Sequence, residues 1–218
     1  MSIENKKTLD IYKEKANVYL NNNIEHEKNY PDIEREKKLF LYKLIRESFK
    51  ELPPKGKVFE IGSGDGSNSK YIESLGYDVL ASDTVNPFLD CLRKKGLKYI
   101  KFNVLENSFP EKYFGIFCWR VFTHFTMDDA FTVIEKVYNS LEQDGIFIFN
   151  ALNHDDKNID NEWIDYEGEY HIGKKRFFNY FYRDQLDEII KNNHFHIKDF
   201  CYEGDNNKWL VYVLKKTI

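Results

Sequence analysis

The sequence contains little cysteine, proline or glycine and no long apolar segment. Its three cysteines, Cys91, Cys118 and Cys201, are odd in number and far apart, so neither a disulfide framework nor a zinc site is expected. No apolar run approaches the ~20 residues that a membrane-spanning helix needs. Residues 1–20 are charged throughout and lack the apolar core of a signal peptide. We therefore expect a cytoplasmic protein with neither a metal site nor a membrane partner.

The sequence also lacks an excess of basic residues. Lys and Arg total 32 against 36 Asp and Glu, a formal net charge of -4, whereas a dedicated nucleic-acid-binding protein is usually strongly basic. Aromatic residues are abundant instead, with 15 Tyr, 18 Phe and 3 Trp among 218 residues. Either a biased genome or a functional need for aromatic side chains would explain this surplus. A chain of this length supports one domain, residues 1–218.

The hydrophobic residues follow two patterns, a helical periodicity and short apolar runs typical of strands. Helical periodicity covers Thr8–Asn22 and Ile33–Phe49, upstream of the turn-forming pair Pro53-Pro54. Beyond this pair, strands are expected at Lys57–Ile61, Tyr77–Ala81, Tyr99–Phe102, Gly115–Trp119 and Ile146–Asn150, and helices at Ser67–Leu75, Pro87–Lys95 and Asp128–Leu141. Strands that alternate with helices predict an α/β fold, a doubly wound and mostly parallel sheet with helices on both faces.

The alternation ends after Asn150. Residues 151–182 are polar and aromatic without a clear period, and this stretch is too long for an ordinary connection, which indicates a lid or a binding loop. A helix is expected at Arg183–Asn193. The strands Phe195–Tyr202 and Lys208–Leu214 share a tight turn and must therefore be antiparallel. The expected parts are N-terminal cap helices in 1–52, a ligand-binding core in 53–150, an insert in 151–182, and a helix with an antiparallel strand pair in 183–218.

Three glycines at alternate positions follow the first expected strand. Gly62, Gly64 and Gly66 stand between Lys57–Ile61 and the helix that begins at Ser67. Glycine allows a positive φ and lets a ligand approach bare backbone, while a helix N-terminus presents unbonded N–H groups. Because an ordinary tight turn rarely needs three glycines, we favour a ligand-binding turn.

The residues around this turn narrow the choice of ligand. A phosphate-binding P-loop requires a lysine that the turn lacks, and the dinucleotide fingerprint has a different glycine spacing, Gly-x-Gly-x-x-Gly. Carboxylates at Glu60 and Asp65 would repel a pyrophosphate, so a cationic or zwitterionic ligand fits better. The alternatives are a solvated turn residue at Asp65 and a structural acceptor at Glu60. Asp83 ends the second strand, where a carboxylate accepts both hydroxyls of a ribose or caps the next helix.

Residues 58–150 resemble the core of a class I S-adenosylmethionine-dependent methyltransferase. The acidic-x-Gly-x-Gly-x-Gly motif of that family matches Glu60, Gly62, Gly64 and Gly66, and its ribose-binding acid matches Asp83. The fifth-strand signature matches Leu141, Gly145 and the run IFIFN. Tyr12, Ala16 and Tyr19 resemble the start of small-molecule members, whose N-terminal helix covers the cofactor. Two positions depart from the pattern, since Asn103 stands where an adenine-contacting Asp is usual and Gly115 replaces the usual Asp of the fourth strand.

The resemblance implies a seven-stranded sheet whose last strand is antiparallel, with the N-terminal helices and the insert after the fifth strand as a lid. It also implies S-adenosyl-L-methionine as the cofactor. The cofactor-binding residues that it implies are Glu60, Gly62, Ser63, Gly64, Gly66, Asp83, Thr84, Asn103, Val104, Trp119, Arg120, Tyr12 and Tyr19.

Methyl transfer needs mainly in-line positioning and a deprotonated acceptor. His124 and His154 follow the fourth and fifth strands, at the sheet edge where open α/β proteins bind ligands, and they are the candidate general bases. The alternatives are packing roles for both histidines and a reaction without a base. The candidate acceptor-binding residues lie in the insert and are Trp163, Tyr166, Tyr170, His171 and Arg176; the alternative is that Phe177–Phe181 forms an extra strand or a helix start that packs on the core.

We therefore expect methyl transfer to an oxygen or nitrogen atom of a small polar metabolite, with no nucleic-acid partner. An anionic acceptor would suit the cationic trio Lys174-Lys175-Arg176. The alternatives are a nucleic-acid or protein methyltransferase and a non-catalytic S-adenosylmethionine-binding module, while the glycine spacing disfavours a dinucleotide-dependent oxidoreductase. The identity of the acceptor and the oligomeric state are left open.

Overall fold

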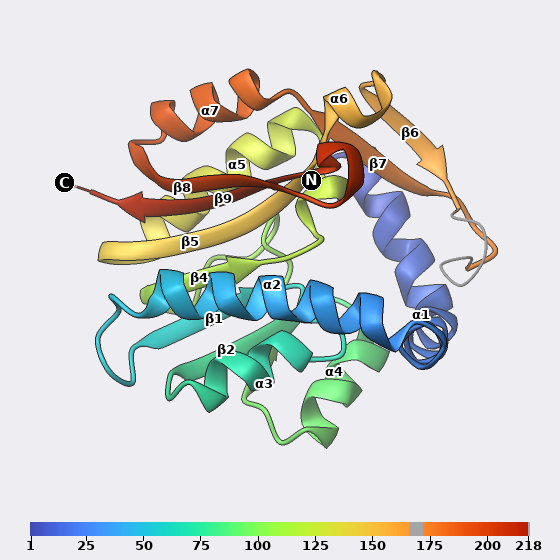
Figure 1. Ribbon diagram of the computed structural model, residues 1–218, viewed down its shortest axis with the longest axis horizontal. Coiled ribbons are helices and arrows are strands. Elements are labelled where there is room, and N and C mark those ends of the chain that lie inside the picture. Colours follow the sequence, from blue (N-terminus) through green and yellow to red (C-terminus); the bar gives the residue numbers. More distant parts are fainter. Residues whose placement is uncertain (166–171, 218) are drawn as a thin grey trace.

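The apolar runs of the sequence form the strands of one central sheet (Figure 1). The computed structural model describes residues 1–165 and 172–217. Within them the strands are β1 (Lys57–Ile61), β2 (Asp78–Asp83), β3 (Tyr99–Lys101), β4 (Tyr113–Cys118), β5 (Leu141–Asn153), β6 (Asn161–Ile164), β7 (Arg176–Phe181), β8 (Phe195–Glu203) and β9 (Trp209–Lys216). Neighbouring strands from β3 through β2, β1 and β4 to β5 are parallel. β9 is antiparallel to β5, and β8 pairs with β9, which confirms the mostly parallel sheet with an antiparallel last strand.

Helices cover both faces of the sheet. They are α1 (Ile3–Asn29), α2 (Pro31–Phe49), α3 (Ser67–Ser74), α4 (Asn86–Lys94), α5 (Met127–Ser140), α6 (His154–Lys157) and α7 (Arg183–Asn192), with short 3₁₀ turns η1 (Phe122–His124) and η3 (Asp205–Asn207). Side chains cap the starts of α1 and α5: the hydroxyl of Ser2 accepts from the N–H of Asn5 in α1, and that of Thr126 accepts from the N–H of Asp129 in α5. None of the described helices is both long enough and apolar enough to cross a bilayer.

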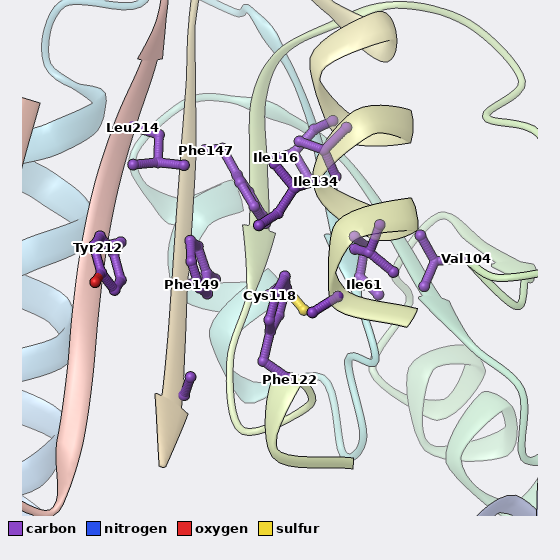
Figure 2. Packing of buried hydrophobic residues seen from close by; sticks show 14 of the residues in the cluster. Ile61, Val104, Ile116, Cys118, Phe122, Ile134, Phe147, Phe149, Tyr212 and Leu214 are labelled. Atoms are coloured by element: carbon purple, nitrogen blue, oxygen red, sulfur yellow. The ribbon is translucent and has the colours of Figure 1, made fainter. Parts of the chain in front are cut away.

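The core lies between the sheet and these helices. In Figure 1, α5 and α7 lie on one side of the sheet and α2 and α3 on the other. The larger cluster joins β4, β5 and β9 to α5, and Figure 2 shows Phe147 and Phe149 of β5 between Tyr212 and Ile116 of the neighbouring strands. The rings of Phe149 and Tyr212 stack with centroids 5.1 Å apart. Much of the aromatic surplus is therefore ordinary core packing.

The insert adds two strands that the seven-stranded expectation did not include, so the described sheet has nine. β7 runs parallel to the end of β5, with Leu152 opposite Tyr180, and β6 pairs antiparallel with β7. All six residues of β7 are buried, which confirms the alternative of an extra strand on the core. The aromatic side chains of β7 point into the protein because β5 extends past the end of β4 and offers it a free edge.

Candidate functional site

The glycine turn links β1 to α3 and is shaped by close packing. Gly62, Gly64 and Gly66 have φ values of +68°, +53° and +81°, which side-chain-bearing residues rarely adopt. A Cβ on Gly62 would lie 2.5 Å from Cγ2 of Val121, and a Cβ on Gly66 would lie 2.6 Å from Cδ2 of Leu92. A Cβ on Gly64 would meet nothing within 4 Å. Gly62 and Gly66 are thus required by protein packing, whereas Gly64 faces open space.

Hydrogen bonds fasten this turn to the end of β2. The N–H of Ser63 donates to the carbonyl of Ser82 (2.7 Å), and the N–H of Gly64 donates to Oδ2 of Asp83 (3.0 Å). Glu60 lies behind the turn, buried, and its carboxylate accepts from the hydroxyl of Ser69. Burial raises the pKa of Glu60 to about 7. The position of Glu60 matches the structural alternative rather than direct contact with a ligand.

Asp83 ends β2 with both carboxylate oxygens at the rim of the turn. Oδ1 accepts from the N–H of Val85 and Oδ2 from that of Gly64. Burial raises the pKa of Asp83 to about 6, although these two backbone donors favour the ionised form. Each oxygen keeps a further lone pair, so the carboxylate can still accept hydroxyl donors.

A cavity of about 150 Å³ opens beside the turn at the carboxyl ends of β1, β2 and β4. The predicted site residues that line it are Gly62, Gly64, Asp83, Thr84, Asn103, Val104, Trp119, Arg120, Tyr12, Tyr19 and His124. Ser63 and Gly66 belong to the turn itself and, like Glu60, are not among the lining residues. The structure therefore brings together residues from six separate segments of the sequence.

Helix α1 closes one side of this cavity. Its rings Tyr12 and Tyr19 meet edge to face with centroids 5.7 Å apart, and each also packs edge to face on Phe88 of α4. Two polar residues one and two turns before Tyr12, Thr8 and Asn5, also line the cavity. Asn5 lay outside the helix expected from the sequence, which began at Thr8, and Thr8 was not singled out. The spacing of three residues from Asn5 to Thr8 and four from Thr8 to Tyr12 was the signal for a shared face.

The arrangement fits a zwitterionic nucleoside ligand. Gly64 leaves an open cradle above the turn, Asp83 offers acceptor oxygens, and the rings of Tyr12, Tyr19 and Phe88 supply an apolar wall. Among the described residues, no group of three or more His, Cys, Asp or Glu side chains could hold a metal ion.

Comparison with known proteins identifies this arrangement. Residues 59–149 match the model of a family described as a methyltransferase domain. Residues 59–149 form a methyltransferase domain, and the chain has the fold of class I S-adenosylmethionine-dependent methyltransferases. It is accordingly a methyltransferase with S-adenosylmethionine as its cofactor. No protein of curated function has a significantly similar sequence.

Solved structures share the fold of this methyltransferase at low sequence identity. An S-adenosylmethionine-dependent methyltransferase from Clostridium acetobutylicum ATCC 824 is 14% identical, with a TM-score of 0.69 over 90% of this chain and 97% of the other. The PH0226 protein of Pyrococcus horikoshii OT3 is 16% identical, with a TM-score of 0.69 over 85% and 92%. The magnesium protoporphyrin IX methyltransferase of Synechocystis PCC 6803, solved with bound cofactor, is 14% identical, with a TM-score of 0.65 over 86% and 83%.

His124 lies in the cavity wall of the methyltransferase with both ring nitrogens engaged. Nδ1 is 2.7 Å from the carbonyl oxygen of Phe177, so it carries the proton, and Nε2 then accepts from the hydroxyl of Tyr12 (3.0 Å). Nη1 of Arg176 donates to the same hydroxyl (3.0 Å). Burial, with the nearby guanidinium of Arg176, lowers the pKa of His124 to about 4. The ring is neutral and connects α1, η1 and β7.

Arg120 also contributes to the wall, through its backbone. It has a φ of +61°, and its N–H donates to Oδ1 of Asn150 (2.7 Å). Its guanidinium makes two 3.0 Å hydrogen bonds to the carboxylate of Glu203 and lies 3.7 Å from the ring centroid of Trp209. The side chain of Arg120 thus ties the cavity edge to the β8–β9 hairpin.

Three of the remaining predicted residues are described by the structure, and none of them lines the cavity. His154 begins α6 and stacks on Tyr182 with ring centroids 3.7 Å apart. Trp163 of β6 packs against Phe177, and Arg176 donates a hydrogen bond to the hydroxyl of the wall residue Tyr12. Tyr166, Tyr170 and His171 lie outside the described residues.

Proposed function

We propose that the enzyme methylates an oxygen or nitrogen atom of a small polar metabolite. The observation that carries this proposal is the closure of the cavity by α1. Asn5, Thr8 and Tyr12 bond to η1 and β7, which lie more than one hundred residues away in the chain. A nucleic acid or a protein would need an open edge to bring its acceptor atom to a cofactor covered by α1, whereas a small molecule can reach it without such an edge. The net charge of -4 also favours a partner other than nucleic acid.

We assign the cavity to the cofactor. The lining residues Gly62, Gly64, Asp83, Thr84, Asn103, Val104, Trp119, Arg120, Tyr12 and Tyr19 would hold it, and Glu60, Ser63 and Gly66 would keep the turn in shape. Asp83 would accept the ribose hydroxyls, as its position at the end of β2 favours.

Methyl transfer mainly requires that the acceptor be positioned against the cofactor. The bound cofactor supplies a methyl group on a sulfonium, so the residues of this chain need to orient the acceptor and exclude water. His124 can take a proton only by giving up its bond from Tyr12, and burial opposes its charged form. We therefore propose that His124 positions Tyr12 rather than acting as a base. An amine that is already unprotonated would need no base.

The insert would complete the acceptor site. Trp163, Tyr166, Tyr170 and His171 remain the proposed acceptor-binding residues, while Arg176 would act through Tyr12. The similar Synechocystis protein is named for a small molecule, magnesium protoporphyrin IX, which supports a small acceptor without identifying it.

A methyl-transfer screen tests this proposal. The enzyme is incubated with S-adenosylmethionine and pools of small metabolites, including amines, alcohols, carboxylates and phosphorylated compounds, and S-adenosylhomocysteine release is measured. Bulk RNA and denatured protein serve as macromolecular acceptors. We expect turnover with a small-molecule pool that is lost in Asp83→Ala. Turnover on RNA or protein alone would contradict the proposal, as would cofactor binding with no turnover on any pool.

A further inference from the structure

The amide of Asn5 has one half engaged and one half unpaired. Asn5 is 3% exposed and lines the cavity. Its Nδ2 donates to the carbonyl oxygen of His124 (3.2 Å). A carbonyl oxygen can only accept, so this contact fixes which end of the amide is the NH₂ group. The other end, Oδ1, is buried and has no hydrogen-bond partner in the described part of the chain.

A buried amide oxygen without a donor opposes folding unless a ligand satisfies it. Several buried side-chain atoms in the described residues have no partner, and Oδ1 of Asn5 is the one among them that belongs to a cavity-lining residue. A donor group on a molecule bound in the cavity would satisfy it.

The surrounding groups indicate what kind of donor is recognised. The hydroxyl of Tyr12 donates its single proton to Nε2 of His124 and accepts from Nη1 of Arg176, so it presents no donor to the cavity. Oδ1 of Asn5 is an acceptor and suits an amino group.

Asn103, the residue at the position expected to contact adenine, is already engaged locally. Its Oδ1 accepts from the N–H of Leu105 (3.1 Å), and its Nδ2 lies 3.5 Å from Sδ of Met1. Met1 precedes Asn5 by four residues, so the start of α1 adjoins this end of the cavity. Asn103 Oδ1 thus already has one donor, whereas Asn5 Oδ1 has none.

We propose that Oδ1 of Asn5 accepts a hydrogen bond from an amino group of the bound cofactor, which makes Asn5 a specificity-determining residue. The two amino groups of S-adenosylmethionine are the 6-amino group of adenine and the methionine ammonium. The inference rests on the proposed assignment of the cavity to the cofactor, and binding of S-adenosylhomocysteine to the wild type tests that assignment separately.

Calorimetry with three probes distinguishes the two groups. S-Adenosylhomocysteine has both, S-inosylhomocysteine lacks the 6-amino group, and 5′-methylthioadenosine lacks the amino-acid part. If adenine is recognised, Asn5→Leu weakens binding of S-adenosylhomocysteine and 5′-methylthioadenosine about tenfold and leaves S-inosylhomocysteine unchanged. If the ammonium is recognised, the two homocysteine probes weaken about tenfold and 5′-methylthioadenosine does not.

A matched control separates recognition from the docking of α1. Thr8→Val removes another α1 anchor, the hydroxyl that accepts from the N–H of Phe177 (3.0 Å), and should leave the ratios among the three probes unchanged. Equal weakening of all three probes by Asn5→Leu, or no weakening of any, would overturn the proposal. Asn5→Ala carries the same test if the leucine variant does not fold.

Discussion

Gly62→Ala should destabilise the protein far more than Gly64→Ala, although both change the same turn. Each glycine has a positive φ, and a side-chain-bearing residue there costs about 1–2 kcal/mol, offset by roughly 0.4–1 kcal/mol from the stiffer unfolded chain. Only at Gly62 does the new Cβ approach a neighbour, at 2.5 Å from Cγ2 of Val121. Valine has a stiff χ1 and cannot rotate away at no cost, and such overpacking costs about 1–3 kcal/mol more.

Thermal unfolding followed by circular dichroism measures the difference. For a chain of this size each kcal/mol lowers the melting temperature by about 2–4 °C, so we expect a fall of roughly 2–18 °C for Gly62→Ala and of no more than about 6 °C for Gly64→Ala. For cofactor affinity we expect the opposite order: Gly64→Ala should weaken binding more than Gly62→Ala, because a methyl group on Gly64 would enter the open space of the cavity.

A double-mutant cycle attributes the effect to Val121. Val121→Ala removes the methyl group that Gly62→Ala would strike, so the double variant should recover at least about 1 kcal/mol relative to additive single changes. Equal melting temperatures for the two glycine variants, or an additive cycle, would refute the packing argument and leave only backbone conformation as the reason for Gly62.

Three further outcomes are expected. Because burial raises the pKa of Asp83 to about 6 and only its ionised form accepts two hydroxyls, S-adenosylhomocysteine affinity should fall as the pH drops from 7 to 5. Calorimetry should show this pH dependence disappear in Asp83→Asn, and its persistence would exclude Asp83 as the cause. Tyr12→Phe leaves Nε2 of His124 without its donor and should lower the unfolding free energy by about 1–3 kcal/mol. Urea titration measures this loss, and an unchanged urea midpoint would contradict the contribution of the contact. Glu203→Gln removes the charge from the two-point contact with Arg120 and should lower the unfolding free energy by about 1 kcal/mol at both low and high salt. If high salt instead lowers the stability of the wild type to that of the variant, the contact is a screened surface pair.

Features that depend on short stretches of chain could be predicted from the sequence. The alternation of strands and helices follows from hydrophobic period, and the antiparallel end follows from a tight turn between two strands. The glycine turn and Asp83 were equally local, because a positive φ and a carboxylate at a strand end are properties of a few adjacent residues. All of these expectations concern residues that are close together in the sequence.

Contacts between distant segments were decided by the tertiary structure. Tyr12 meets His124 across 112 residues and Thr8 meets Phe177 across 169, and no periodicity relates such pairs. The sheet edge offered by β5 pairs with β7, a strand within the insert, and the aromatic side chains of β7 are buried in the core rather than part of a lid.

The sequence by itself determined a methyltransferase-like core, its cofactor turn and its acidic strand end, because local backbone chemistry specifies them. Only the tertiary structure decided which polar groups share the cavity. It brought His124 into the wall in a neutral, fully bonded state, left His154 elsewhere, and added Asn5. The physical reason is that burial and hydrogen-bond partners, which set the protonation and role of a side chain, are properties of the packed molecule.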